Sequence, residues 1–497
     1  MAYDPLSAWQ PHFAISVTGH RPDNPSFADN APAVEAVLET IFERVAVRAS
    51  ALAGDSTPDV RMYTLCAQGV DLLAARLAFA KGWELLTPLP FGAGLNLAIS
   101  TGAATRSYVV ALREGGAASD PAVEQSAQAI RTLPDKAHLF EIADRDAEVR
   151  AALEAMLCDP HSADAKRQFD AHLSDNVALT GPLMIERSDL LIAVWDQRYA
   201  NRAGDTGHTV MAALAKSTPV LLINPAHPED WSFLTSAEEL GHLPQAHGGS
   251  AVDAETGADT GRARLDGLVE AALGPAGPSM QAMRSEKWAN KSTFGFGFYR
   301  RIEQFFGGRT TKSGTVQAVY EPPEAIAEGS AAPLLATAQS LLGKDDRVVL
   351  RLRERVLPAF AWSDGISSRL ADAYRSGMSL NFLLSALAII VGIAYLPLGL
   401  ASQKWIFAGV ELLLLAIIVT TWARSKRGWH RRWFETRRVA EYLRFGPVLA
   451  IMGVARPAAR WPKGDEDEWP ERFSRDALRE VGLPEVRIDR AYLRCVL

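Results

Sequence analysis

Cysteine is scarce in this chain of 497 residues. Its three cysteines, Cys66, Cys158 and Cys495, are far apart and odd in number. Such usage is typical of a reducing compartment and argues against a disulfide framework or a cysteine-based zinc site. His20 and His208 are the candidate metal ligands among the histidines. Spacing places no third ligand beside them, so we predict no metal site.

Neither charge dominates the sequence, and no targeting segment is evident at its start. The net charge is -6 and 22% of the residues are charged, so nothing indicates direct binding to nucleic acid. The first ten residues contain neither a basic segment nor a long apolar one, so we expect no cleaved signal peptide. A hydrophobic content of 48% is ordinary for folded protein.

One absence of charge is local. The 28 residues from Ser376 to Gln403 include no Asp, Glu, Lys or Arg. After Lys404, the stretch 405–422 is apolar except for Glu411 and two threonines. Because a helix needs about 20 apolar residues to cross a bilayer, we predict two membrane spans over about residues 377–400 and 405–422. A buried helical hairpin in a soluble protein is the alternative.

The basic residues predict the orientation of these spans. Seven basic residues follow the second span, two arginines precede the first, and the turn between the spans carries only Lys404. The positive-inside rule therefore places both ends of the chain in the cytoplasm and the short turn outside. Two helices cannot enclose a channel, so a pore would require a homo-oligomer in contact with lipid. Glu411 either reaches the outer headgroups or faces a polar lumen in that oligomer.

Near-continuous apolar runs alternate with helical stretches over residues 13–224, which predicts a Rossmann-like parallel α/β sheet. The predicted strands are Phe13–Thr18, Val60–Leu65, Glu84–Leu89, Ala137–Ile142, Asp189–Trp195 and Pro219–Asn224. The predicted helices include Ala31–Ala53, Val70–Lys81 and Thr209–Lys216.

The rest of the chain is expected to be less regular before the membrane part. Residues 242–277 are rich in Gly, Ala and Asp and are interpreted as a loop or insertion. The aromatic and basic stretch 287–306 is expected to pack on the sheet domain. These interpretations divide the chain into a sheet domain (1–280), a connector (281–355), an all-α two-helix transmembrane domain (356–455) and a cytoplasmic C-terminal segment (456–497).

Three loops at strand ends carry chemistry suited to an anionic ligand, because ligands bind outside the carboxyl ends of parallel strands. Glycine permits close approach, arginine pairs with phosphate, and helix N-termini present free N–H groups. The candidate residues are Thr18, Gly19, His20 and Arg21 in the first loop, Gln68, Gly69 and Asp71 in the second, and Asp196, Gly204, Thr206, Gly207, His208 and Thr209 in the third.

Each of these loops also has a purely structural interpretation. Glycine and threonine are favoured in turns and helix caps, so one such loop alone would indicate little. Asp71 either caps a helix or contacts a ribose. Cys66 is interpreted as a packing residue, because no histidine is positioned beside it. Three loops on the same sheet edge favour a nucleotide site.

The stretches "VTGHRP", "AQGVDLLAARLAFAKG", "TPLPF", "SDLLIAVWDQ" and "DTGHTVMAALAKSTPVLLINP" together resemble the SLOG superfamily over roughly residues 12–225. This superfamily includes DNA-processing-A proteins, lonely-guy phosphoribohydrolases and bacterial nucleotide sensors. The resemblance implies a Rossmann-like fold that binds a nucleotide, an ADP-ribose-type signal or a cyclic nucleotide, with no further cofactor. It implies ligand contacts at the matching positions in the three loops, among them Thr18, Arg21, Gly69, Gly207 and Thr209.

One departure from that family bears on catalysis. Lonely-guy enzymes carry a Pro-Gly-Gly-x-Gly-Thr-x-x-Glu pattern, whose Glu serves hydrolysis. Here "VMAALA" follows Thr209 and supplies no such Glu. Because hydrolysis needs a general acid or base within reach of the bond, binding is favoured over catalysis and we expect no enzyme activity. A membrane-anchored nucleotide hydrolase or phosphoribohydrolase remains the alternative.

The membrane part is similar to SLATT two-transmembrane effector modules over about residues 360–455, on the stretches "SRLADAYRSGMSLNFLLSALAIIVGI" and "RRWFETRRVAEYLR". Such modules accompany SLOG and cyclic-nucleotide sensors in bacterial anti-phage systems. The two resemblances imply an effector that senses a nucleotide second messenger, oligomerises and permeabilises the inner membrane. A purely structural anchor is the third interpretation.

Overall fold

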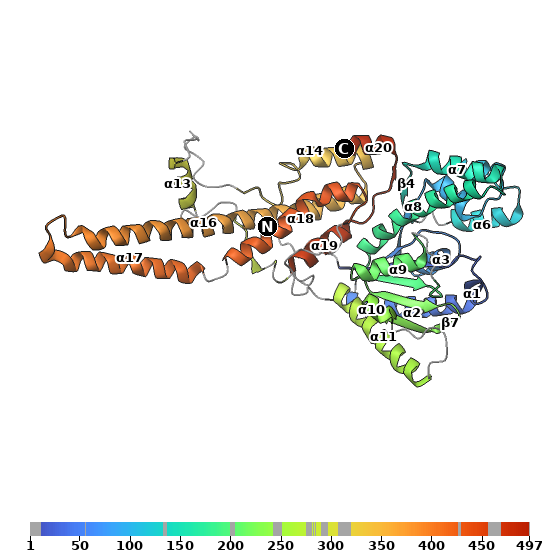
Figure 1. The fold of residues 1–497 in the computed structure, drawn as a ribbon, viewed down its shortest axis with the longest axis horizontal. Helices are drawn as coiled ribbons and strands as arrows, with labels where there is room; N and C mark the ends of the chain where they lie inside the picture. Colours follow the sequence, from blue (N-terminus) through green and yellow to red (C-terminus); the bar gives the residue numbers. More distant parts are fainter. Residues whose placement is uncertain are drawn as a thin grey trace.

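The computed structural model describes residues 11–54, 56–132, 137–198, 204–241, 251–274, 281, 283, 285–289, 297–306, 320–425, 429–455 and 469–496. Its N-terminal part is built on an eight-stranded sheet that is largely parallel (Figure 1). The strands are β1 (His12–Gly19), β2 (Asp59–Tyr63), β3 (Glu84–Leu89), β4 (Ala137–Ile142), β5 (Leu190–Val194), β6 (Val220–Asn224), β7 (His227–Leu234) and β8 (Val486–Ile488). All six strands predicted from the apolar runs are present.

The strand order is β7-β6-β5-β1-β2-β3-β4-β8, with β7 antiparallel to β6 and the other pairs parallel. From β1 the chain first moves outward through β2, β3 and β4. It then returns to place β5 on the other side of β1, where Gly19 lies opposite Val194. The loops after β1 and β5 therefore diverge at a topological switch point, where open α/β sheets bind ligands.

Alternate residues of the central strand point to opposite faces of the sheet, as the two-residue period requires. Phe13, Ile15 and Val17 are buried on one face with α2, α3 and α11. Ala14 is buried on the other face with residues of the helical region. Helices on both faces explain why the strands are apolar throughout. The helices of this part are α1 (Pro25–Ala28), α2 (Ala31–Ala53), α3 (Val70–Ala80), α4 (Ala93–Ser100), α5 (Arg106–Arg113), α6 (Pro121–Arg131), α7 (Asp146–Cys158), α8 (Ala163–Arg187), α9 (Thr206–Ala215), α10 (Ala237–Gly241) and α11 (Ala251–Leu273).

The interpretation of 242–277 as a loop or insertion was wrong over α11. Leu265, Val269 and Leu273 recur every four residues and are buried in the core. Arg44 of α2 also makes two hydrogen bonds to Asp266 of α11, at 2.7 and 2.8 Å. A composition rich in Gly and Asp disfavours a helix, but one buried apolar stripe outweighs that preference.

The second half of the chain is helical and includes one long apolar helix. Its elements are α13 (Phe298–Phe306), α14 (Ala332–Leu342), α15 (Arg347–Arg351), the π-helical turn η3 (Leu352–Val356), α16 (Leu357–Ala394), the 3-10 turn η4 (Ala401–Gln403), α17 (Lys404–Ser425), α18 (Trp429–Ile451), α19 (Trp469–Val481) and α20 (Arg490–Val496). Within the described residues, the continuous stretch Arg347–Ala394 is the one helix whose length and composition suit a membrane span.

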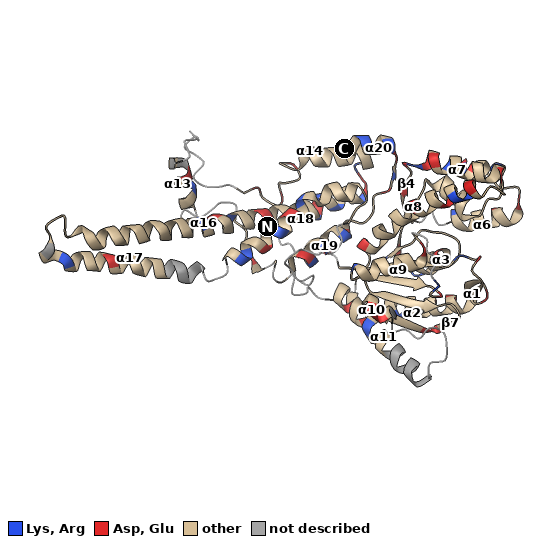
Figure 2. Cartoon of the chain, in the orientation of Figure 1, with Lys and Arg blue, Asp and Glu red and all other residues tan. Residues whose placement is uncertain are grey.

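The two halves of α16 have different surroundings. Its buried residues run from Leu357 to Ser376, and beyond that point only Ala388 is buried. The outer half pairs with α17, and the pair extends away from the sheet as an almost uncharged hairpin (Figures 1 and 2). Large apolar side chains are exposed along it, including Phe382, Ile389, Leu412 and Leu413.

The expectation that residues 287–306 pack on the sheet domain was wrong for α13, which lies against α16. Arg300 of α13 pairs with Asp372 of α16 at 2.8 Å, and the Tyr299 N–H donates to Ser376 Oγ at 3.1 Å. These polar contacts hold α13 on α16. The position of α13 thus marks the level at which the charge-free run of α16 begins.

The C-terminal segment returns to the sheet domain. Strand β8 pairs in parallel with β4, with Ile142 opposite Ile488. Phe473 and Leu478 of α19 share one core with Tyr63 and Leu86 of the sheet. Residues 456–497 were assigned to a separate segment on the sequence; within its described part, 469–496, they complete the sheet edge and connect the sheet to the hairpin helices.

Candidate functional site

The loops after β1 and β5 meet at the switch point through His20 and Asp196. The Asp196 N–H donates to His20 Nε2 at 3.0 Å, and Asp196 Oδ1 lies 3.1 Å from the same nitrogen. One ring nitrogen thus lies within hydrogen-bonding distance of both the backbone and the side chain of Asp196. This contact links the loop after β1 to the loop after β5.

The β2–α3 loop presses directly onto the first loop. The Val70 N–H donates to the His20 carbonyl at 3.3 Å. Gly69 has φ +97°, and a Cβ there would lie 2.4 Å from the His20 oxygen. A Cβ on Gly19 would lie 2.7 Å from Val70 Cβ. Both glycines are thus required by the close approach of the two loops.

The third loop begins α9 with a side-chain cap. Asp205 accepts a hydrogen bond from the His208 N–H at 2.6 Å, and the buried Thr209 hydroxyl donates to the Asp205 carbonyl at 3.1 Å. A Cβ on Gly207 would lie 2.7 Å from the Trp195 ring, so this glycine brings the helix onto the end of β5. Gly204 has φ +83° and precedes the cap.

The junction where the loops after β1, β2 and β5 meet is called the crevice below. Two charged groups dominate its electrostatics. Burial raises the pKa of Asp71 to about 7, although the nearby Arg21 guanidinium and the backbone N–H groups of Ala67 and Leu65 favour its carboxylate form. The Arg21 guanidinium is exposed, and it makes no hydrogen bond or ion pair with a side chain in the described part of the chain. It is therefore a cation available to a ligand where the loops meet.

The three loops chosen from the sequence thus lie together at one sheet edge. Many of their residues have structural roles. His20 and Asp196 join two loops, and Asp71 accepts hydrogen bonds from its own loop. Three glycines permit close packing: Gly19, Gly69 and Gly207. Thr18, Gln68 and Thr206 are half-buried, and Arg21 and His208 are exposed. Among the described residues no group of three His, Cys, Asp or Glu side chains is arranged for a metal ion.

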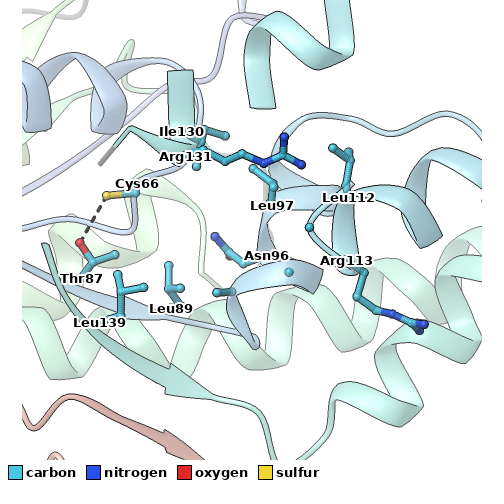
Figure 3. Close-up of a pocket in the computed structure, with 13 residues that line it drawn as sticks. Cys66, Thr87, Leu89, Asn96, Leu97, Leu112, Arg113, Ile130, Arg131 and Leu139 are labelled. Atoms are coloured by element: carbon cyan, nitrogen blue, oxygen red, sulfur yellow. Dashed lines mark hydrogen bonds between the residues drawn. The ribbon is translucent and has the colours of Figure 1, made fainter. Parts of the chain in front are cut away.

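Sequence reasoning missed a cavity of about 250 Å³ next to this crevice. It lies at the carboxyl ends of β2, β3 and β4 and is covered by α4, α5 and α6 (Figure 3). Thr87, Leu89 and Leu139 of the strands line it together with Asn96, Leu97, Leu112, Arg113, Ile130 and Arg131 of the covering helices. The signal that could have found it is the length of the β3–β4 connection, which carries three extra helices.

Cys66 lies in the wall of this cavity, and its Sγ is 3.3 Å from Thr87 Oγ1. Burial raises the pKa of the Cys66 thiol to about 12. A thiol with this pKa stays protonated at neutral pH and is a poor nucleophile. Its interpretation as a packing residue agrees with this environment.

Glu411, the candidate effector residue, faces the partner helix of the hairpin. Its carboxylate oxygens lie 3.4 and 3.5 Å from the position that a Cβ on Gly392 of α16 would occupy. Glu411 is nevertheless exposed to the surroundings of the isolated chain. It therefore lies at one edge of the α16–α17 contact.

Comparisons with family models, with curated proteins and with solved structures find no match to this chain. What the structure establishes is a Rossmann-like parallel α/β sheet joined to a helical region with one long apolar helix.

Proposed function

We propose that this chain is a nucleotide-gated membrane effector. The observation that carries the proposal is α16, one unbroken helix of 38 residues. Its first half is buried in a core shared with the sheet, and its second half is an apolar arm. A change at the sheet edge would therefore reach the arm through a rigid element and not through a flexible linker.

The proposed ligand is an anionic, nucleotide-derived second messenger of the ADP-ribose or cyclic-nucleotide type. The convergence of three loops at the switch point, the exposed Arg21 and the N-termini of α3 and α9 support an anion site. The SLOG-like motifs described above favour the same class of ligand. No further cofactor enters the proposal.

The proposed effector step is insertion of the α16–α17 hairpin in the inner membrane, with both ends of the chain cytoplasmic. A belt of aromatic and basic side chains where the charge-free run begins supports this placement. Arg375 lies 5.6 Å from the Tyr299 ring centroid and 5.8 Å from that of Trp433, and the Tyr374 and His430 rings are 5.0 Å apart. Aromatic and basic residues are enriched at membrane interfaces.

Assembly of several hairpins would then permeabilise the membrane, as in SLATT-like effectors of anti-phage defence. Glu411 would line the shared lumen, where carboxylates favour cations. Liposomes that contain the protein should release dye when the nucleotide is added. Arg21→Ala should weaken the response about tenfold or more in ligand concentration, because a charged hydrogen bond contributes about 1.5–3 kcal/mol.

Glu411→Gln should keep leakage but reduce the preference for cations in reversal-potential measurements. Leakage that is independent of nucleotide, or equal nucleotide sensitivity in Arg21→Ala, would contradict the gated effector. Cation selectivity unchanged in Glu411→Gln would remove Glu411 from the lumen.

A second candidate function, a membrane-anchored nucleotide hydrolase, is favoured by Asp71. A buried carboxyl with a pKa of about 7 can act as a general acid or base at neutral pH. Incubation of the purified protein with excess ADP-ribose or nucleotide, followed by chromatography, separates the two functions. The effector proposal expects intact ligand, whereas turnover that disappears in Asp71→Asn would establish the hydrolase.

A further inference from the structure

The cavity beneath α4, α5 and α6 adjoins the crevice but is distinct from it. Leu89 and Leu139 are residues of β3 and β4, and Cys66 follows β2, so the cavity opens at the ligand-binding edge of the sheet. The covering helices α4 (93–100), α5 (106–113) and α6 (121–131) are inserted between β3 and β4. They form a roof over strand ends that would otherwise be exposed.

Asn96 is the unusual residue of this cavity. Its side chain lines the space, is only 5% exposed, and makes no hydrogen bond with any residue in the described part of the chain (Figure 3). The other polar side chains of the lining are engaged: Thr87 with Cys66, Arg131 with Glu124 at 3.2 Å, and Arg113 with Glu114 at 3.0 Å. The Asn96 amide therefore faces the space of the cavity and is available to a ligand that supplies a hydrogen-bond partner.

The walls indicate what kind of ligand this is. Leu97, Leu112 and Ile130 on the roof face Leu89 and Leu139 of the sheet, which leaves apolar surfaces around one amide. An amide both donates and accepts, which is the pattern required to bind the edge of a nucleobase.

The size of the cavity limits which part of a ligand it can take. About 250 Å³ is below the roughly 300–1,000 Å³ of sites that enclose a whole drug-sized ligand. It accommodates one flat ring with its substituents. We propose that this cavity binds the base of the nucleotide ligand, with the Asn96 amide hydrogen-bonded to the edge of the ring; the inference rests on the proposed function.

The remainder of the ligand would lie along the β2–α3 loop. This loop places Cys66 in the cavity wall and reaches Gly69, which lies against the backbone of His20 and Arg21. A ring held in the cavity and a phosphate held at Arg21 are therefore joined by one loop. The division of roles is that the cavity selects the base and the crevice binds the charge.

The test compares two variants against two kinds of probe. The full chain in detergent is titrated calorimetrically with the four common ribonucleosides, with their 5′-monophosphates and with ADP-ribose. Asn96→Leu should weaken the best nucleoside and its monophosphate alike, by about tenfold, because both lose the pair to the base. Arg21→Ala should weaken only the phosphate-bearing probes.

The stability of the variants separates a binding role from a structural one. Because the Asn96 amide has no protein partner, Asn96→Leu should melt at or above the temperature of the parent, whereas a structural hydrogen bond would lower it. If Asn96→Leu fails to fold, Leu97→Phe carries the test of the cavity. Leu97→Phe, which narrows the cavity from the roof, should reproduce the loss of nucleoside binding.

Two results would overturn the inference. If the phosphate probes bind with dependence on Arg21 but neither Asn96→Leu nor Leu97→Phe changes any affinity, the cavity is not the base site and the proposed function stands. If none of these probes binds the parent, the inference about the cavity fails, and the proposed function fails with it if cyclic nucleotides also cause no release of dye from liposomes.

Discussion

At the scale of single residues, Asp71 combines two opposed effects. Burial in the β2–α3 loop disfavours its charge, while Arg21 and two backbone N–H groups favour it, and burial prevails. The pKa of Asp71 in the folded state, about 7, lies above the ordinary value of 3.8. The folded protein therefore binds a proton more tightly at this site than the unfolded chain does.

This difference predicts a pH dependence of stability. The contribution of Asp71 is fully present below pH 3.8 and is lost as the pH rises through about 7. The asparagine of Asp71→Asn does not titrate. This variant should therefore not show the loss of stability, on the order of a few kcal/mol, that the parent shows between pH 5 and 8. Melting temperatures of the parent and Asp71→Asn across this range provide the measurement. Asp23→Asn, at an exposed aspartate, is the matched control. Equal pH profiles of stability for the parent and Asp71→Asn would refute the raised pKa of Asp71.

At the scale of elements, the crevice depends on how closely the β2–α3 loop approaches β1. Gly69 has φ 97° and ψ -132°, a region that other residues rarely adopt, and the backbone of His20 occupies the space of a Cβ. Gly82 also has positive φ, +74°, but nothing lies within 4 Å of the position of its Cβ. A comparison of alanine substitutions at these two glycines therefore separates the cost of backbone strain from the cost of disturbed loop packing.

Gly69→Ala should destabilise the protein more than Gly82→Ala. The latter loses only the left-handed conformation, about 1–2 kcal/mol. Gly69→Ala adds displacement of the His20–Arg21 backbone, so we expect a further loss of stability and weaker binding of phosphate-bearing probes. Chemical denaturation and calorimetry measure the two effects. Equal losses of stability in the two variants would show that the approach of the loops contributes nothing.

At the scale of the whole molecule, α19 joins the hairpin helices to the sheet through Arg479. This buried guanidinium donates to the carbonyls of Glu186 and Ser188, each at 2.8 Å, and pairs with Asp189 at 2.8 Å. Arg61 of β2 donates to the Glu480 carbonyl at 2.9 Å. The end of α19 is thus fixed beneath the start of β5, at the edge opposite the crevice.

Arg479→Ala should disrupt this connection. The variant leaves the largely buried Asp189 carboxylate without the Arg479 guanidinium. Loss of one partner of a buried ion pair lowers the free energy of unfolding by about 3–5 kcal/mol. Arg490→Ala is the control, because its ion pair with Glu148 is 68% exposed on the arginine side and such pairs contribute about 0–1 kcal/mol. Under permissive conditions Arg479→Ala should still bind nucleotide but release less dye from liposomes. Parent-like stability would argue against the role given to α19.

The sequence by itself determined the elements whose signals are local. Apolar runs between helical stretches predicted the first six strands, and Gly, Thr and charged residues after them located the loops of the crevice. The charge-free run located the apolar arm. These elements can be predicted because each is encoded by consecutive residues. A strand buried on both faces is a run of apolar residues, and an apolar helix is a run without charge.

Only the tertiary structure decided the features made by residues far apart in the chain. Strand β8 has three residues and is held by pairing with β4, so its own sequence carries no signal. Helix α11 forms because Leu265 and Val269 find a surface on the sheet. The cavity around Asn96 exists because α4, α5 and α6 fold back over the strand ends. Pairing, burial and enclosure are properties of the assembled fold, and a single segment does not contain them.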